Sequence, residues 1–151
     1  MRCVQWGLAV CLLPAGAWAQ TNALVGTWSI ASLVEDHAGG KQSQPFGEHP
    51  NGAISYGQDG TVFVFIATSD RAKSTAPAMQ PVGPVVAYYG TYTLDGTNLT
   101  NHVKGSTYPN FEGTEQKGVV TVSGDHAKLV RTITGGAETF TSTLELTRVS
   151  K

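Results

Sequence analysis

Beyond residue 19, apolar and polar residues alternate along short segments that clusters of Gly, Pro, Asn and Asp separate. Alternation with a period of two is typical of strands that bury one face, and no helical period is sustained over three turns. The pattern predicts eight β-strands, at residues 24–35, 52–56, 61–68, 85–94, 98–105, 114–122, 128–134 and 139–149.

Short turns join most of these segments. Glycine stands beside Asp or a second Gly in four of them, a composition typical of tight hairpins. They are Gly57–Gly60, Asp95–Gly96, Gly124–Asp125 and Gly135–Gly136. Hairpins make consecutive strands antiparallel, and eight strands suffice for a sheet to close on itself. We therefore predict an all-β fold, an eight-stranded antiparallel up-and-down β-barrel, with an eight-stranded sandwich as the alternative.

The longest irregular connection is residues 69–84. It holds three of the seven prolines, with Met79 in its middle. Connections of this length without regular structure often have a function, so we interpret it as a lid or crossover loop.

The first and last predicted strands carry residues suited to closing one end of a barrel. Gly26 has no Cβ, so another segment can pass close to it. Trp28 points to the same side of the strand and can plug the end of the barrel. Arg148, near the other terminus, is predicted to lie over this indole in a cation–π contact.

The segment Thr61–Ile66 is apolar on both faces. A strand with one face in the core must bury its other face or expose it as a contact patch. The outer side of this strand is therefore predicted to be covered or to bind a partner.

Residues 1–19 have the features of a cleavable signal peptide. Arg2 precedes an apolar run over Cys3–Pro14, and Ala17-Trp18-Ala19 supplies small residues at the expected cleavage site. We expect export to the periplasm or outside the cell, with residues 20–151 forming one domain. Both cysteines leave with the leader. No later stretch has the length of a membrane-spanning helix, so the protein is expected not to span a membrane.

Charge and chemistry exclude several classes of function. Only 14% of residues are charged, and the formal net charge is −1, without a basic cluster. This argues against binding to nucleic acid or to an anionic membrane. The four histidines are scattered and no nucleotide motif is present, so we predict no metal site and no cofactor.

Several segments, taken in order, resemble one family: Leu24–Trp28, Pro50–Tyr56, Tyr88–Tyr92, Asn101–Val103 and Pro109–Gln116. The chain is similar to the lipocalin-like domain proteins of bacteria and fungi, which belong to the wider calycin and lipocalin barrels. The resemblance covers nearly all of residues 20–151. It implies the barrel, whereas an activity has to be argued from a site.

The best polar cluster is His102 with Gln116. If His102 points inward, its imidazole and the Gln116 amide could meet the phenols of Tyr88 and Tyr92 inside the barrel. The alternation of residues 98–105 instead puts Leu99 and Val103 on one face and His102 on the other, which favours His102 outside.

The leading hypothesis is an exported barrel that binds a small, mostly apolar molecule in its interior. Its expected lining is Phe63, Phe65, Tyr88, Tyr92 and Phe140, with His102 and Gln116 orienting the ligand. One alternative is an isomerase or cyclase that acts on a hydrophobic substrate in the same interior. Another is an envelope protein that binds a partner with the outer face of residues 61–68. The sequence leaves the ligand, the catalytic question and the oligomeric state open.

Overall fold

The computed structural model describes residues 23–75, 83–135 and 138–150. The predicted leader and Met79 lie outside the described residues. The regular elements run in the order β1 Gly26–Asp36, η1 Ala38–Gly40, β2 Gln42–Ser43, β3 Asn51–Tyr56, β4 Thr61–Ala67, β5 Val85–Asp95, β6 Asn98–Ser106, η2 Pro109–Phe111, β7 Glu115–Ser123, β8 His126–Gly135 and β9 Glu138–Ser150. Every predicted strand is therefore present.

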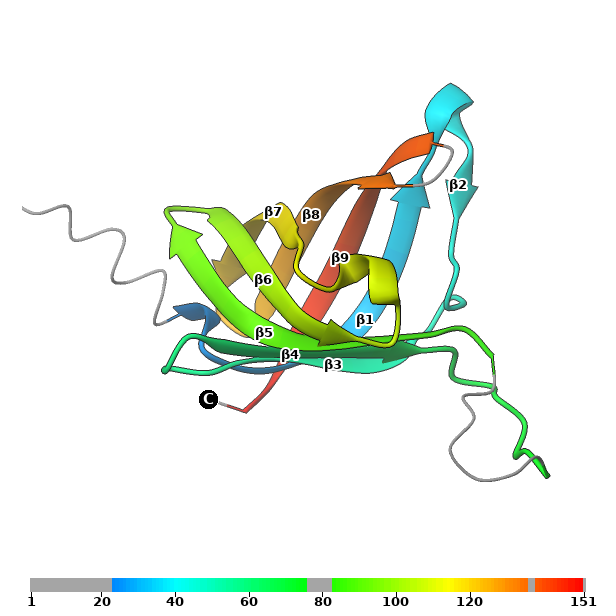
Figure 1. Cartoon of the computed structure of the whole chain (residues 1–151), viewed down its shortest axis with the longest axis horizontal. Coiled ribbons are helices and arrows are strands. Elements are labelled where there is room, and N and C mark those ends of the chain that lie inside the picture. The colour runs from blue at the N-terminus through cyan, green and yellow to red at the C-terminus, as the bar shows by residue number, and fades with distance from the viewer. Residues whose placement is uncertain (1–22, 76–82, 136–137, 151) are drawn as a thin grey trace, which may run out of the picture.

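The sheet closes into a barrel of eight antiparallel strands, which confirms the predicted fold class (Figure 1). From β3 to β9 each strand pairs with its neighbour in the chain, and β1 pairs with both β3 and β9. The closing ladder between β1 and β9 runs from Thr27↔Ser150 to Asp36↔Thr141. Each barrel strand is thus paired on both sides over at least part of its length.

Strand β2 was missed by the sequence analysis. It pairs only with β1, through Glu35↔Ser43 and Asp36↔Gln42, and the resulting hairpin extends beyond the barrel rim (Figure 1). Two residues in a polar, Gly-rich stretch are too short to show an alternating pattern.

A β-bulge interrupts the alternation of inward and outward side chains in β1. Ala31 is the extra residue, because Ile30 pairs with Leu146 and Ser32 with Glu145. The bulge shifts the alternation by one, so Leu33 is buried while Val34 is only half-buried. Unbroken alternation would put Val34 on the core face with Trp28 and Ile30. Because of the bulge, Val34 lies on the outer face of the strand.

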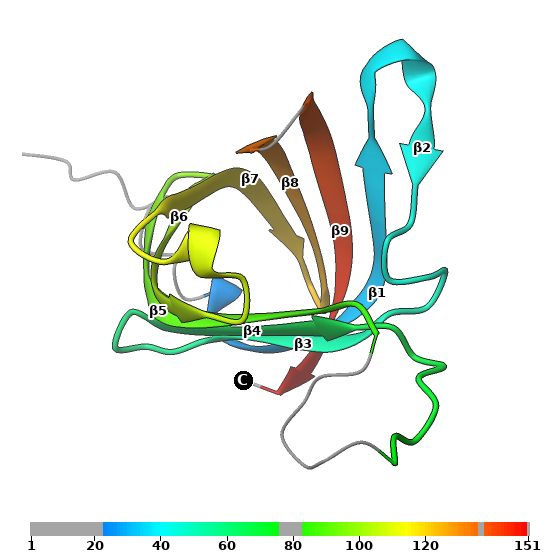
Figure 2. The same cartoon turned by 45° about the vertical axis from the view of Figure 1, so that its right-hand side comes forward.

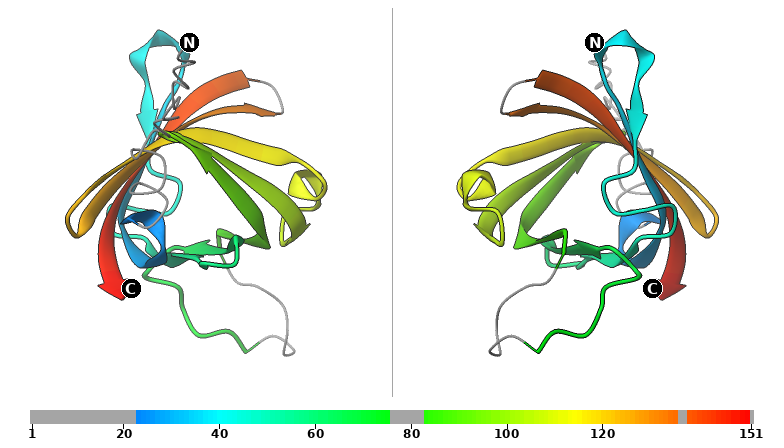
Figure 3. Two further views of the ribbon diagram at one scale, coloured as in Figure 1. Left: turned by 90° about the vertical axis from the view of Figure 1, so that its left-hand side faces the viewer. Right: turned by 90° about the vertical axis from the view of Figure 1, so that its right-hand side faces the viewer.

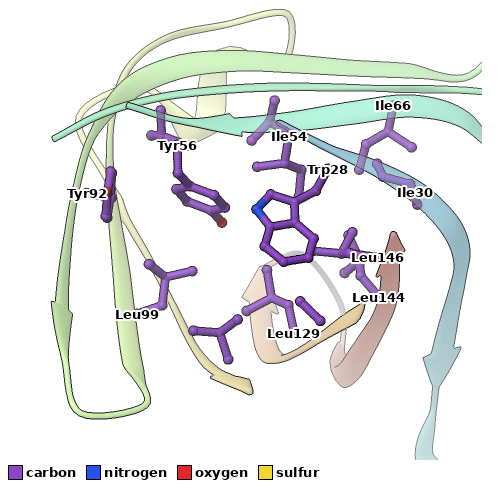
Figure 4. Close-up of a cluster of buried hydrophobic side chains, with 14 of the residues drawn as sticks. Trp28, Ile30, Ile54, Tyr56, Ile66, Tyr92, Leu99, Leu129, Leu144 and Leu146 are labelled. Carbon is purple, nitrogen blue, oxygen red and sulfur yellow. The ribbon is translucent and has the colours of Figure 1, made fainter. Parts of the chain in front are cut away.

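The barrel has a closed end and an open end. Short turns join β3–β4, β5–β6 and β7–β8 at the closed end, where aromatic and aliphatic side chains fill the interior (Figure 4). Trp28 is fully buried there, and its Nε1 donates to Leu24 O at 2.8 Å. The longer connections surround the open end, which Figure 2 shows facing the viewer.

Arg148 lies over the indole, as the sequence predicts. Its Cζ is 4.0 Å from the Trp28 ring centroid, and its Nη1 and Nη2 donate to Val25 O at 3.0 Å and Ala23 O at 2.6 Å. Gly26 has φ +127°, a backbone conformation that residues with a Cβ rarely adopt. The structure thus gives a conformational reason for the glycine.

Candidate functional site

The open half of the barrel contains a cavity of about 180 Å³. Aliphatic and aromatic side chains from six strands and two connections make up most of its wall, among them Leu33, Phe46, Ile54, Val64, Ile66, Val86, Phe111, Ile133, Phe140 and Leu144. The cavity sits above the filled closed end, so the core of Trp28, Tyr56 and Leu129 forms the base on which it rests.

A lateral groove of about 570 Å³ adjoins this cavity. The ladder between β7 and β8 runs from Ser123↔His126 only as far as Val119↔Val130, and the two strands then diverge toward the open end (Figure 3). Four residues line both the groove and the cavity, namely Phe111, Gln116, Ile133 and Phe140. The split between β7 and β8 is therefore a side entrance to the interior, with polar and charged residues such as Glu115 and Lys117 on its outer part and Phe111, Ile133 and Phe140 toward the cavity.

A polar cluster lies in the cavity wall. Arg131 of β8 is only 8% exposed, and its Nη1 donates to the Tyr88 hydroxyl at 3.0 Å. Asn101 Nδ2 donates to the same hydroxyl at 2.9 Å. Tyr88 accepts both bonds, so its own hydroxyl proton is left to donate.

Several buried polar atoms of this cluster have no hydrogen-bond partner. They are Arg131 Nε, Arg131 Nη2, Tyr56 OH and Asn101 Oδ1. Among the residues that the structure describes, no carboxylate lies within 4 Å of Arg131. A charged guanidinium without a counter-ion inside a barrel is costly, so the cluster calls for a functional explanation.

The phenol of Tyr56 is a neutral donor in this cluster. Burial raises its pKa well above the usual value near 10, and the nearby Arg131 guanidinium only partly opposes the shift. The Tyr56 ring packs edge-on against Tyr92 with centroids 5.0 Å apart, which holds its hydroxyl inside the barrel (Figure 4).

Glu35 is the second charged group in the cavity wall, and it is held by the rim of the open end. Its Oε2 accepts from Ser43 Oγ at 3.0 Å. His37 lies between Ser43 and Glu138, with Nε2 2.7 Å from Ser43 Oγ and Nδ1 2.9 Å from Glu138 Oε1.

The Ser43–His37–Glu138 contacts have the order of a hydrolytic triad, but the proton directions differ. Ser43 gives its hydroxyl proton to Glu35, so His37 Nε2 has to donate to Ser43 Oγ and does not act as its base. The negative charge of Glu35 would also oppose an oxyanion formed at Ser43. The network ties the β1–β2 hairpin to β9.

Three of the seven predicted ligand-binding residues line the cavity: Tyr88, Gln116 and Phe140. Gln116 Nε2 donates to Thr114 Oγ1 at 2.9 Å, and Phe140 packs against His37 with centroids 5.2 Å apart. Tyr92 points inward but belongs to the filled end, where its hydroxyl donates to Gly57 O at 3.0 Å.

Phe63 and Phe65 point out of the barrel, which corrects their predicted place in the lining. They are 58% and 40% exposed, because Val62, Val64 and Ile66 take the inner face of β4. Phe63 stacks on Tyr89 of β5 with centroids 6.2 Å apart, beside an outer depression of about 580 Å³. The two-sided apolar strand thus exposes its second face, as one of the two predicted outcomes requires.

His102 also lies outside. Its side chain is 39% exposed, and its Nδ1 is 3.3 Å from Glu115 Oε1 on β7. Its neighbours Asn101 and Val103 take the inner face of β6. The alternation of this strand gave the correct orientation, and the inward polar group is Asn101.

Sequence analysis missed Arg131, the most informative side chain of the site. The segment 128–134 alternates Leu129, Arg131 and Ile133 on one face, and an arginine at an inward position of an apolar face is a detectable exception. Gly118 of β7 makes room for it, since a Cβ at residue 118 would lie 2.8 Å from Arg131 Cγ.

Within residues 23–75, 83–135 and 138–150, no three His, Cys, Asp or Glu side chains gather in a way that would hold a metal ion. Nor does any helix there have the length and hydrophobicity to cross a membrane.

Comparisons with known proteins give a family match that spans the barrel. The family model described as "lipocalin-like domain" matches residues 25–148, from the start of β1 almost to the end of β9. Among solved structures, a lipocalin-like protein from Bacteroides uniformis is similar at 12% identity and a TM-score of 0.49, over 84% of this chain and 99% of that one. No curated protein matches the chain.

Proposed function

Since the chain belongs to the lipocalin-like domain family, we propose that it binds a small, mostly apolar molecule inside its barrel. The observation that carries the proposal is the mostly apolar cavity of about 180 Å³ in the open half, with the side entrance between β7 and β8. An enclosed apolar wall with a few convergent polar groups is the usual form of a small-molecule site.

The lining favours binding by burial of apolar surface. Leu33, Ile133 and Phe140 present aliphatic and aromatic carbon to the cavity, and each Å² of apolar surface removed from water contributes roughly 25 cal/mol. The filled closed end keeps this region rigid, so a ligand does not have to order the barrel as it binds.

The proposal is tested with N-phenyl-1-naphthylamine, an uncharged probe whose fluorescence rises in apolar surroundings. We expect saturable binding to the wild-type protein and a loss of affinity of about tenfold for Phe140→Ala, which removes a ring from the cavity wall. Phe63→Ala removes an equal ring from the outer face of β4 and serves as the matched control. No saturable binding, or an equal loss for both variants, would contradict the proposal.

The two alternative functions receive different support. An isomerase or cyclase in which His102 acts has no geometric basis, because His102 faces away from the cavity. Partner binding by the outer face of β4 is favoured by the exposure of Phe63, Phe65 and Tyr89. Sedimentation of the wild type and of Phe65→Ser over a range of concentrations would detect self-association through this face.

Export is part of the proposal. The leader at residues 1–19 motivates it. The expected result is a mature protein recovered from the periplasm or the medium. Its intact mass should match a chain that begins at Gln20. A cytoplasmic protein that keeps residue 1 would contradict it.

A further inference from the structure

The Arg131 cluster selects the chemistry of the ligand. Arginine stays charged under all ordinary conditions, and 92% of this side chain is withdrawn from solvent. Its hydrogen bond in the described chain goes to the Tyr88 hydroxyl, which is neutral and already accepts from Asn101, and the neutral Tyr56 phenol lies close to the guanidinium. A desolvated cation with neutral neighbours stabilises any anion that reaches it.

The geometry of the unpartnered atoms matches a carboxylate. Nη1 is occupied by Tyr88, and the two groups left over are Nε and Nη2. These two N–H groups lie on one edge of the planar guanidinium and point in parallel. A carboxylate accepts from such an edge through both oxygens.

Neighbouring hydroxyls add further donors. Tyr88 keeps its own proton to donate, and the hydroxyl of Ser142, which pairs with Arg131 in the β8–β9 ladder, lies in the cavity wall. The Tyr56 hydroxyl is buried without a partner in the same cluster. This set supplies protons and one positive charge, which suits an anion and does not suit a cation.

The charges also set the direction in which a ligand enters. Glu35 stands at the rim, where Ser43 holds its carboxylate at 3.0 Å, and it repels an acidic group that stays near the mouth. Between Arg131 and the side entrance the wall offers Ile133 and Phe140 to a hydrocarbon chain, while Glu115 and Lys117, which pair with each other at 2.9 Å, lie in the groove outside. An acid therefore binds with its head at Arg131 and its chain toward the entrance.

We propose that the ligand is an amphiphilic carboxylic acid, whose carboxylate pairs with Arg131 and whose hydrocarbon chain fills the cavity and the split between β7 and β8. The proposal rests on the proposed function, because it requires that the interior accepts a ligand at all. It adds the chemical class of the ligand and its orientation in the cavity. It also names Arg131 as the residue that distinguishes an acid from a neutral molecule.

The test compares octanoate with octanol, which share a chain and differ in the head. Each is titrated by displacement of N-phenyl-1-naphthylamine from the wild type, Arg131→Met and Arg131→Lys. We expect the wild type to prefer octanoate by about tenfold or more, and Arg131→Met to lose about 10- to 100-fold in octanoate affinity with octanol affinity unchanged. Arg131→Lys keeps the charge and should retain part of the preference.

Arg148→Met is the matched control, because it removes a second arginine charge at the closed end, over Trp28. It should bind octanoate as the wild type does. If the wild type binds octanol and octanoate equally, or Arg131→Met weakens both alike, the carboxylate assignment is wrong while interior binding stands. If neither compound displaces the probe, or the probe itself does not bind, the proposed function has failed. The comparison of octanoate with octanol on the wild type needs no variant, so it tests the carboxylate assignment even if a variant does not fold.

Discussion

Arg131 and Tyr56 show how single residues depart from the rules for a barrel core. Both are buried with polar atoms that make no hydrogen bond in the described structure, whereas most of the barrel core is apolar. Unsatisfied polar groups lower stability, each by about 1–3 kcal/mol. Residues with such unsatisfied groups often belong to a binding site, where a bound ligand supplies the missing hydrogen-bond partner.

Tyr56 gives a pH prediction. Unfolded tyrosines ionise near pH 10, while burial keeps folded Tyr56 protonated above that value. The folded state then binds more protons, so the free energy of unfolding falls as the pH rises past about 10. Tyr56→Phe should show a shallower fall between about pH 9 and pH 11, measured by urea unfolding. A residual slope is expected from Tyr92, whose pKa is raised by burial and by the charge of Asp59.

Near pH 8, Tyr56→Phe should change stability by less than about 1 kcal/mol, because the hydroxyl that it removes adjoins Asn101 and Arg131 but makes no hydrogen bond of good geometry with them. A large loss of stability at this pH, or an alkaline slope identical to that of the wild type, would contradict the placement of Tyr56.

At the scale of single elements, strands β7 and β8 determine access to the interior. They pair near the closed end and separate beyond Val119↔Val130. Gly118 lies at this point of separation, where an added Cβ would meet Val130 O at 2.7 Å and Arg131 Cγ at 2.8 Å. The glycine lets the Arg131 stem pass beneath β7.

Gly118→Ala is therefore expected to push β7 away from β8. Overpacking of this kind costs about 1–3 kcal/mol of stability, and the displaced guanidinium should bind octanoate less tightly. Chemical unfolding and the displacement titration measure the two effects. Lys104→Ala, at an exposed residue of β6 outside the cavity and the groove, is the control and should leave both unchanged. A fully stable Gly118→Ala would contradict the close approach.

The elements were more predictable from the sequence than the site. Alternation and Gly-containing turns located all eight barrel strands within a few residues, because each strand buries one face. The bulge at Ala31 and the two-residue β2 were not predictable, since neither leaves a periodic pattern. Phe63 and Phe65 were misplaced because both faces of β4 are apolar, and period alone cannot then distinguish inside from outside.

The site could not be predicted in the same way, because it depends on which inward-pointing side chains of different strands lie close together. Tyr88, Asn101 and Arg131 come from β5, β6 and β8, and their hydrogen bonds follow from strand register. Register is set across the whole sheet, so a local pattern cannot show it. An arginine on an apolar face was the available clue.

At the scale of the whole molecule, the two ends of the barrel have separate roles. The closed end is filled by Trp28 and its neighbours and covered by Arg148, which joins the last strand to the segment before β1. The open end holds the cavity and the polar cluster. Stability and binding should therefore respond to different residues.

Arg148→Met tests this separation. It removes hydrogen bonds to Val25 O and Ala23 O and the contact with the indole, so a loss of about 1–3 kcal/mol in the free energy of unfolding is expected. Its affinity for N-phenyl-1-naphthylamine should match the wild type at a temperature where both are folded. Weakened binding comparable to that of Phe140→Ala would show that the ends are coupled.

A crystal structure of the protein grown with octanoate would show where the ligand binds and how it is oriented. We expect the alkyl chain of octanoate inside the barrel along Ile133 and Phe140, with both carboxylate oxygens within hydrogen-bond distance of Arg131 Nε and Nη2. Octanoate on the outer face beside Phe63 and Tyr89, or a carboxylate in the barrel that points away from Arg131, would contradict this expectation.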